Sequence, residues 1–133
     1  MKKGALEADA FVNAARELLN QGDAVGAERI LSPVLNQFKA DAPVMHLMGQ
    51  IKKAQNRIDE AERHFRAAIA HDLSFGNYYN ELGIVLQARG AYEEAVRVFR
   101  AALALTPTTL MVRVNIVRCL MAMNDLAEAE REA

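Results

Sequence analysis

The 133-residue chain contains a single cysteine, no tryptophan and no long apolar run. Because Cys119 is alone, an intramolecular disulfide framework and a cysteine metal cluster are both excluded. The most apolar long stretch, residues 110–123, is broken by Arg113, Asn115 and Arg118, whereas a bilayer span needs roughly 18 to 20 consecutive apolar residues. The N-terminal residues also lack a secretory apolar segment. We therefore expect a cytoplasmic protein without a membrane span.

An excess of charge of either sign is also missing. The formal net charge is −1, whereas a protein that neutralises nucleic-acid phosphates needs a basic face. We therefore expect no nucleic-acid partner. Apolar residues make up 52% of the chain and charged residues 25%, which is enough to bury a core in one domain or one short array of repeats.

Motifs for catalysis are absent as well. Neither Ser32 nor Ser74 lies in a G-x-S-x-G turn, and the chain has no phosphate-binding loop, no H-E-x-x-H and no dinucleotide fingerprint. His64 and His71 lie seven residues apart and could share a helix face as metal ligands, but we favour a surface histidine near the next unit and a histidine near a helix end. Cys119 is interpreted as a small core residue rather than a reactive thiol. We expect no enzyme activity, no cofactor and no metal.

The chain does contain a repeat of 34 residues. Residues 60–70 read EAERHFRAAIA, and residues 94–104 read EAVRVFRAALA. Self-similarity at such a period is typical of stacked helical units. The aligned columns are Ala27, Ala61, Ala95 and Ala129; Ala15, Gly49, Gly83 and Val117; Leu31, Phe65 and Phe99; Gly22, Asn56, Gly90 and Asn124; and Ala24, Ile58, Tyr92 and Leu126.

Each column has a physical reason. Gly and Asn most easily enter the left-handed conformation that closes a helix, so one column marks helix ends. Small residues let two helix axes approach closely, and large ones fill the space between helices. Asp41 and Pro43 indicate a capped helix start. The pattern predicts first helices near 8–21, 42–55, 76–89 and 110–123, and second helices near 24–38, 58–71, 92–105 and from 126 onward.

This unit resembles the tetratricopeptide repeat (TPR), whose motif runs W-x2-L-G-x2-Y, A-x3-F, P. The third unit carries most of the motif: Tyr79, Leu82, Gly83, Leu86, Gly90, Tyr92, Ala95, Phe99, Ala102 and Pro107. The resemblance implies an all-α, right-handed α-solenoid of about three and a half units. An N-terminal extension, 1–7, precedes units 8–41, 42–75, 76–109 and the incomplete 110–133.

Three departures from the family pattern lead to further expectations. Pro33 falls inside a second helix, where we predict a kink or break. Lys52 stands where Leu18, Leu86 and Leu120 stand, so its charged end is expected to reach water. The fourth unit lacks a covering helix, which leaves an apolar end with Leu120, Leu126 and Ala129.

The resemblance implies a protein-interaction module that binds a peptide or partner protein in a concave groove lined by the first helices. Asn13 and Asn115 match positions where some family members bond a ligand's backbone, whereas Val12, His46 and Asn80 do not reproduce the family's carboxylate clamp. An acidic residue or free carboxylate in the peptide is mildly favoured. The candidate groove residues are Val12, Asn13, Arg16, His46, Gln50, Lys53, Asn77, Asn80, Glu81, Ile84, Gln87, Val114, Asn115 and Arg118.

Two other functions stay open at this point. The repeats could form the N-terminal scaffold of a larger bacterial enzyme of the sulfotransferase or glycosyltransferase type. Alternatively, the uncovered apolar end of the fourth unit could pair with its copy in a homodimer. For each groove residue, an ordinary solvated helix face is the alternative to a binding role.

Overall fold

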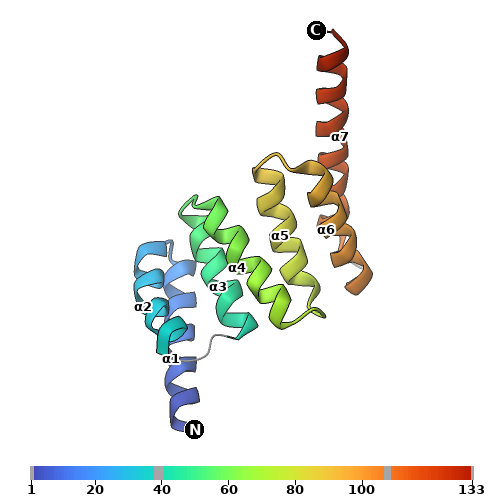
Figure 1. Cartoon of the computed structure of the whole chain (residues 1–133). Helices are drawn as coiled ribbons and strands as arrows, with labels where there is room; N and C mark the ends of the chain where they lie inside the picture. Colours follow the sequence, from blue (N-terminus) through green and yellow to red (C-terminus); the bar gives the residue numbers. More distant parts are fainter. Residues whose placement is uncertain (1, 38–40, 107–108, 133) are drawn as a thin grey trace. The chain divides into compact units, whose positions relative to one another are not determined.

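The computed structural model describes residues 2–37, 41–106 and 109–132. Within these ranges the chain is all-α, with helices and no strands (Figure 1). None of the described helices combines the length and apolarity needed to cross a bilayer. The helices are α1 (Lys2–Asn20), α2 (Ala24–Gln37), α3 (Ala42–Ala54), α4 (Ile58–His71), α5 (Gly76–Ala88), α6 (Tyr92–Leu105) and α7 (Leu110–Glu132).

The turns inside the first three helix pairs form as their Gly and Asn column predicts. Gly22, Asn56 and Gly90 have φ values of 87°, 60° and 83°, the left-handed region that ends a helix. In each turn a backbone N–H reaches back five residues to a carbonyl that the helix leaves open. These bonds join Asp23 to Leu18 at 2.8 Å, Arg57 to Lys52 at 2.9 Å and Ala91 to Leu86 at 2.9 Å.

The start of α3 also follows its sequence signal. The Asp41 side chain accepts a hydrogen bond of 3.1 Å from the backbone N–H of Val44, and Pro43 lies in the first turn. The cap satisfies a donor that has no partner within the helix, and the proline removes none that the helix needs. The helix therefore begins where the cap and the proline predict.

Two helices run farther than the sequence pattern predicts. α1 begins at Lys2 rather than near residue 8, because Ala5, Leu6 and Glu7 are strong helix formers. Of the kink or break predicted at Pro33, the break is wrong, since α2 continues to Gln37. Pro33 is exposed near the end of the helix, and it lies between the buried Leu31 and Val34. Packing on both sides therefore offsets one missing backbone bond.

The helix break predicted at Asn124 is also wrong. α7 is one helix of 23 residues that continues through Asn124 and projects beyond α6 (Figure 1). Among the described non-glycine residues only Asn56 has a positive φ. A turn at Asn124 would break helical hydrogen bonds. Only the packing of a sufficiently long second helix would offset that loss. Residues 126–132 provide about two helical turns, so the straight helix is favoured.

The described structure consists of two compact units, residues 1–72 and residues 73–133. In unit 1, α1 packs on α2, α2 on α3 and α3 on α4. In unit 2, α6 packs between α5 and α7. The core of unit 1 includes Leu31, Leu47 and Ile51, which are fully or almost fully buried.

The same close contact holds the second and third helix pairs together. A Cβ atom added at Gly49 would lie 2.5 Å from a ring carbon of Phe65, and one added at Gly83 would lie 2.4 Å from a ring carbon of Phe99. Both phenyl rings are completely buried. The ring of the second helix therefore lies directly on the backbone of the first helix, which is possible only where the first helix has glycine.

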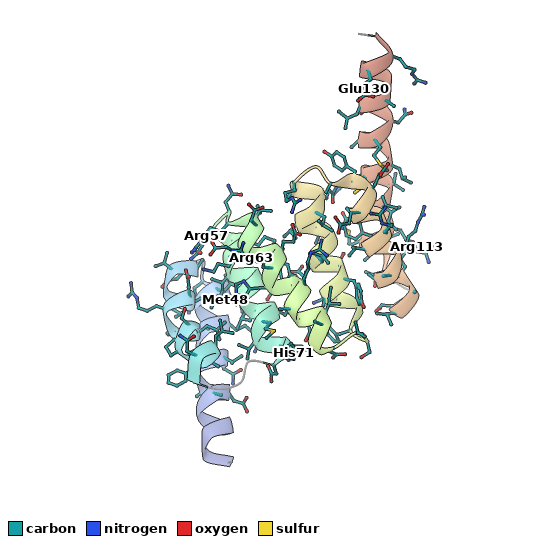
Figure 2. All side chains as sticks on the ribbon, in the orientation of Figure 1. Met48, Arg57, Arg63, His71, Arg113 and Glu130 are labelled. Atoms are coloured by element: carbon teal, nitrogen blue, oxygen red, sulfur yellow. The ribbon has the colours of Figure 1, made fainter. Side chains whose placement is uncertain are left out.

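Lys52 corrects another expectation, because its charged end does not reach water. The residue is only 6% exposed, and its Nζ lies 2.5 Å from a carboxylate oxygen of Glu28 and 3.8 Å from one of Glu60. Gln55 donates to Glu28 at 2.9 Å. Arg57, labelled in Figure 2, reaches Glu28 at 3.4 Å. The substitution of Lys for Leu is thus accommodated by a polar cluster that joins α2, α3 and α4.

Replacing the buried ring of the third pair should destabilise the fold strongly. We expect Phe99→Ala to lower the free energy of unfolding by about 3 to 5 kcal/mol, because it removes buried apolar area and leaves a cavity. Phe11→Ala, at a side chain that is 44% exposed, is the matched control. Urea denaturation followed by circular dichroism measures both changes. Equal denaturation midpoints for Phe99→Ala and wild type would contradict the packing described here.

The polar cluster should make stability depend on acid. The hydrogen bond from Lys52 is the main cause that holds the pKa of Glu28 below its ordinary value. A depressed carboxyl pKa stabilises the folded state above the unfolded pKa of about 4.3, and that contribution is lost as the pH falls through the folded pKa.

Glu28→Gln should therefore lower the free energy of unfolding at pH 7, with a difference from wild type that shrinks below about pH 4. Glu93→Gln, at an exposed side chain of α6, should follow the wild-type curve. Denaturant titrations at a series of pH values measure the three proteins. A difference between Glu28→Gln and wild type that stays constant from pH 7 to pH 3 would contradict the prediction.

Candidate functional site

The first helices of unit 1 present part of the predicted binding face. On α1, Asn13 and Arg16 are exposed, and an Arg16 guanidinium nitrogen donates to Asn13 Oδ1 at 3.3 Å. Val12 is half-buried and packs against the core of unit 1. Of these three side chains, the polar pair is thus free to meet a ligand, whereas the valine mainly supports the fold.

The α3 part of the same face is less open. His46, Gln50 and Lys53 are all half-buried. The imidazole ring of His46 lies 5.7 Å from the ring of Phe65, measured between centroids. Each of these residues offers only part of its surface to a ligand, so α1 carries the more exposed polar groups of the predicted face in unit 1.

The first helices of unit 2, α5 and α7, present six of the predicted residues at least partly to solvent. Asn77 and Arg118 are exposed, and the half-buried ones are Asn80, Ile84, Gln87 and Val114. This gives the face of unit 2 one cation, an exposed amide and apolar side chains. The combination suits a ligand that has both polar and apolar groups.

Two predicted groove residues are buried instead. Glu81 and Asn115 are each 8% exposed, so the prediction that they point outward is wrong. They share a repeat column with Asn13 and Leu47, and Leu47 is 1% exposed within the core of unit 1. The column therefore faces a neighbouring helix in each repeat after the first. The apolar Leu47 could have predicted that this column is buried. The polar residues at the other three positions suggested an exposed face instead.

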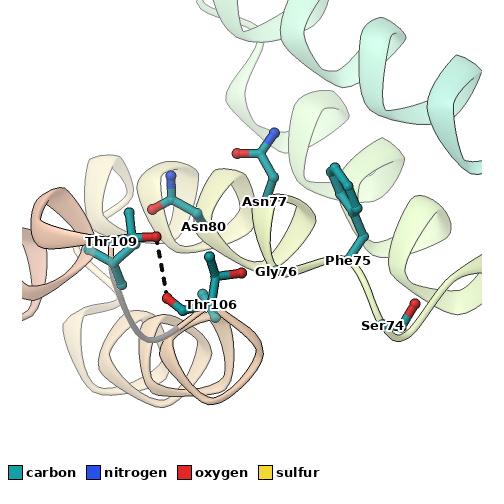
Figure 3. A pocket seen from close by; sticks show the side chains of 9 residues that line it. Ser74, Phe75, Gly76, Asn77, Asn80, Thr106 and Thr109 are labelled. Carbon is teal, nitrogen blue, oxygen red and sulfur yellow. Dashed lines mark hydrogen bonds between the residues drawn. The ribbon is translucent and has the colours of Figure 1, made fainter.

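A pocket of about 370 Å³ lies within unit 2 (Figure 3). It opens where the start of α5, the end of α6 and the start of α7 meet. Sequence analysis identified Asn77 and Asn80 as binding residues, but it missed the other lining residues, because they adjoin only through the packing of α5, α6 and α7. The residues that line this Asn80 pocket are Ser74, Phe75, Gly76, Asn77, Asn80, Ala102, Thr106, Thr109 and Val112.

The wall of the Asn80 pocket depends on a close approach of α5 to the end of α6. Gly76 is buried, and a Cβ atom added there would lie 2.5 Å from Thr106 Oγ1 and 3.2 Å from the carbonyl oxygen of Ala102. Thr109 Oγ1 donates to the carbonyl oxygen of Thr106 at 3.3 Å, which joins α7 to the end of α6 (Figure 3). A larger residue at position 76 would displace Thr106 or the helix end.

Polarity in the Asn80 pocket comes from hydroxyls and amides. Oδ1 of Asn80 is buried and has no hydrogen-bond partner. An acceptor left in this state is destabilising, but the atom has no accessible surface. The lining groups that a ligand can reach are the hydroxyls and the amide of the exposed Ser74, Thr106 and Asn77.

The single thiol of the chain is not available as a nucleophile at these faces. Cys119 is completely buried, and burial raises the pKa of its thiol, so the reactive thiolate is disfavoured at neutral pH. Within residues 2–37, 41–106 and 109–132, no group of three or more His, Cys, Asp or Glu side chains could hold a metal ion. The chemistry that these faces offer is hydrogen bonding, charge and apolar contact.

The helix–turn–helix pairs define a helical-repeat protein of the α-solenoid class. One tetratricopeptide repeat family model matches residues 46–108, and another matches residues 86–133. The chain belongs to the tetratricopeptide repeat family. No curated protein matches it.

Solved structures show the same fold. A mutant O-GlcNAc transferase from Thermobaculum terrenum has a TM-score of 0.83 and 26% identity over 90% of this chain, but the match spans only 23% of the transferase. The first TPR of Spaghetti (RPAP3), bound to the HSP90 peptide SRMEEVD, has a TM-score of 0.84 and 16% identity over 88% of this chain and 93% of its own. The second TPR domain of human RPAP3, in complex with the HSP70 peptide SGPTIEEVD, has a TM-score of 0.81 and 17% identity over 87% of this chain and 97% of its own.

Proposed function

We propose that the chain is a protein-interaction module that binds a peptide or partner protein on the first helices of its repeats. The observation that carries the proposal is the Asn80 pocket, because it lies on α5, a first helix, and offers hydrogen-bonding groups beside apolar ones. The two RPAP3 structures, which have the same fold, hold peptides. Their similarity supports a peptide as the kind of ligand.

The charges of the exposed groups favour a peptide with an acidic residue. Arg16 and Arg118 are exposed on first helices, whereas Glu81 is buried and therefore does not oppose them at the surface. Asp9 and Glu17 are acidic residues that stay exposed on α1. Rim charges of this kind mainly govern the rate of association and the choice of partner.

Charge reversal on the first helices should weaken peptide binding. The probe is the tightest acidic peptide selected from a random twelve-residue phage library on the wild-type protein. A surface this small should bind it with a dissociation constant on the order of micromolar. We expect Arg16→Glu or Arg118→Glu to raise that constant about tenfold, a change of about 1.4 kcal/mol. Fluorescence anisotropy measures it.

Matched controls come from the second helices of the same units. Arg29→Glu on α2 and Arg100→Glu on α6 also reverse exposed arginines, and each should stay within about twofold of wild type. Equal losses for the first-helix and second-helix variants would show non-specific charge attraction. Failure of the library to yield any peptide that binds would overturn the proposed function.

A second candidate function is self-assembly through α7. Leu110, Val117 and Met121 form one exposed apolar stripe along this helix, and they are 70%, 53% and 61% exposed. Their spacing of seven and four residues keeps them on one face. In the second and third pairs, the column of Val117 holds Gly49 and Gly83, which a phenyl ring of the next helix covers. The stripe is thus the face on which the fold elsewhere places a helix.

A second copy of α7, running antiparallel, fits this stripe. Pairing centred on residue 119 would put Val117 against Met121 of the other copy. It would also put Arg113 against Asp125 of the other copy, so opposite charges would flank the apolar contact. Arg113 lies in the first half of the helix, and Glu130 is in its last turns (Figure 2). Leu126 faces away from the stripe and would not take part.

The expected dimer has a mass of about 29 kDa, twice the chain mass of 14.7 kDa. Sedimentation equilibrium should show it for wild type and for Val25→Glu, a control at a residue that is 61% exposed on α2. Val117→Glu should be monomeric. Reversing Arg113 or Asp125 alone should weaken the dimer, and reversing both should restore it. A wild-type monomer at millimolar concentration would exclude this assembly.

A scaffold role inside a larger enzyme has narrower support. It depends on the similarity to the Thermobaculum terrenum transferase, in which the matched part spans 23% of that chain. In such a protein the repeats would position a substrate protein while a separate domain performs the chemistry. The same first-helix faces would then bind the substrate, so this role is a special case of the interaction module.

A further inference from the structure

The packing face of α7 continues into the half of the helix that projects beyond α6 (Figure 1). In the first half, Val112 and Cys119 lie seven residues apart and are 2% and 0% exposed. Met123, Leu126 and Glu130 follow at spacings of four, three and four residues, which keeps them on the same face of the helix. Leu126 is nevertheless 56% exposed. The second half of α7 therefore presents a packing face that lies open to solvent.

This face forms one wall of a groove of about 280 Å³ within unit 2, and the start of α6 forms the other wall. We call it the α6–α7 groove. Tyr92 and Met123 are half-buried, and Leu126 and Ala127 are exposed. Together with Gly90 these side chains give the groove a largely apolar floor, to which two glutamates add charge.

Both charged side chains that line the α6–α7 groove are carboxylates. Glu93 lies in the first turn of α6, and Glu130, labelled in Figure 2, lies near the end of α7. Both residues are exposed. Arg89 and Arg131 are close to them in the chain but do not line the groove. An entering cation therefore meets two carboxylates and keeps part of its hydration, so it avoids the penalty of a buried charge.

An apolar floor with acidic edges fits a long cationic side chain. Lysine and arginine lay their methylene stems along apolar surface while the charged end stays in water. In the α6–α7 groove the stem would lie on Met123 and Leu126, and the charged end would face the glutamates. The ring of Tyr92 offers a further surface on which a guanidinium can stack.

We propose that the α6–α7 groove binds a basic segment of a partner protein, in which a long cationic side chain is flanked by apolar residues. The inference goes beyond the proposed function, because the peptide expected on the exposed first-helix arginines is acidic. The groove also lies on the side of α7 opposite the stripe of Leu110, Val117 and Met121. Pairing of two copies through that stripe would leave it uncovered.

The test uses the complete chain and four capped pentapeptides in a ¹H–¹⁵N NMR titration. Each probe has the form alanine–leucine–X–leucine–alanine, where X is arginine, citrulline, norleucine or glutamate. Citrulline keeps the shape of arginine without its charge, and norleucine provides only an apolar chain. We expect the arginine probe to shift the backbone signals of Gly90, Glu93 and Met123 saturably. Its dissociation constant should be about tenfold lower than those of the other three probes.

Substitutions on both walls separate the groove from general charge attraction. Glu93→Gln and Glu130→Gln should each weaken the arginine probe about threefold, and the double variant about tenfold. Leu126→Ser removes apolar floor and should weaken it about threefold. Asp59→Asn is the matched control, because Asp59 holds the position of Glu93 in the preceding repeat, is exposed and lies in the first turn of α4. It should behave like wild type.

Reversal of both charges gives a result that damage to the fold could not produce. Glu93→Lys combined with Glu130→Lys should shift the preference from the arginine probe to the glutamate probe. Equal affinity of the wild type for the arginine and citrulline probes would overturn the proposal. Equal losses in Asp59→Asn and Glu93→Gln would also overturn it, because they would show binding to any exposed acid.

One further variant distinguishes the groove from the proposed function. Arg118→Glu, which should weaken acidic peptides, should leave the arginine probe within about twofold of its wild-type affinity. If the arginine probe binds in the groove while no acidic peptide binds the chain, the groove stands and the proposed function is wrong. If acidic peptides bind and the arginine probe shifts no groove signal, the proposed function stands and the groove assignment is wrong.

Discussion

The contact between a glycine of one helix and a buried phenyl ring of the next is the constraint on which the repeat depends. It occurs at Gly49 with Phe65 and again at Gly83 with Phe99, and in both places even one added carbon would overlap the ring. Such a fit sets the distance between the two helix axes. The equivalent position in α7 is Val117, which is exposed and has no covering ring. There the pair does not form, and one long helix takes its place.

Much of the fold could be predicted because the residues that form the turns and the helix contacts recur at equivalent positions in successive repeats. Gly22, Asn56 and Gly90 end helices as their column indicates. Asn124 stands in the same column, yet the helix continues. The residue type at one position is therefore not enough to predict a turn. A turn also needs a following helix whose packing offsets the free-energy cost of ordering that helix.

The candidate site was less predictable, since exposure depends on neighbours that one repeat does not contain. Glu81 and Asn115 are polar but buried, and their side-chain types alone suggested a surface. Asn80 was identified from its place on a first helix, but its pocket needs Thr106 and Thr109 from two other helices. Their proximity is a result of tertiary packing. Sequence periodicity can place a residue on a face, but it cannot show what closes around it.

The Glu28–Lys52 ion pair has a consequence for how the chain finds its correct arrangement. Repeats that resemble one another offer many wrong helix partners, and most apolar faces would tolerate several of them. Lys52 is different, because a partner without an acid at the position of Glu28 would leave its buried charge with only the longer contact to Glu60. The correct pairing of helices is thereby favoured over pairings between similar helices of the wrong repeats. We expect the pair to suppress mispaired intermediates during refolding more than it raises the final stability.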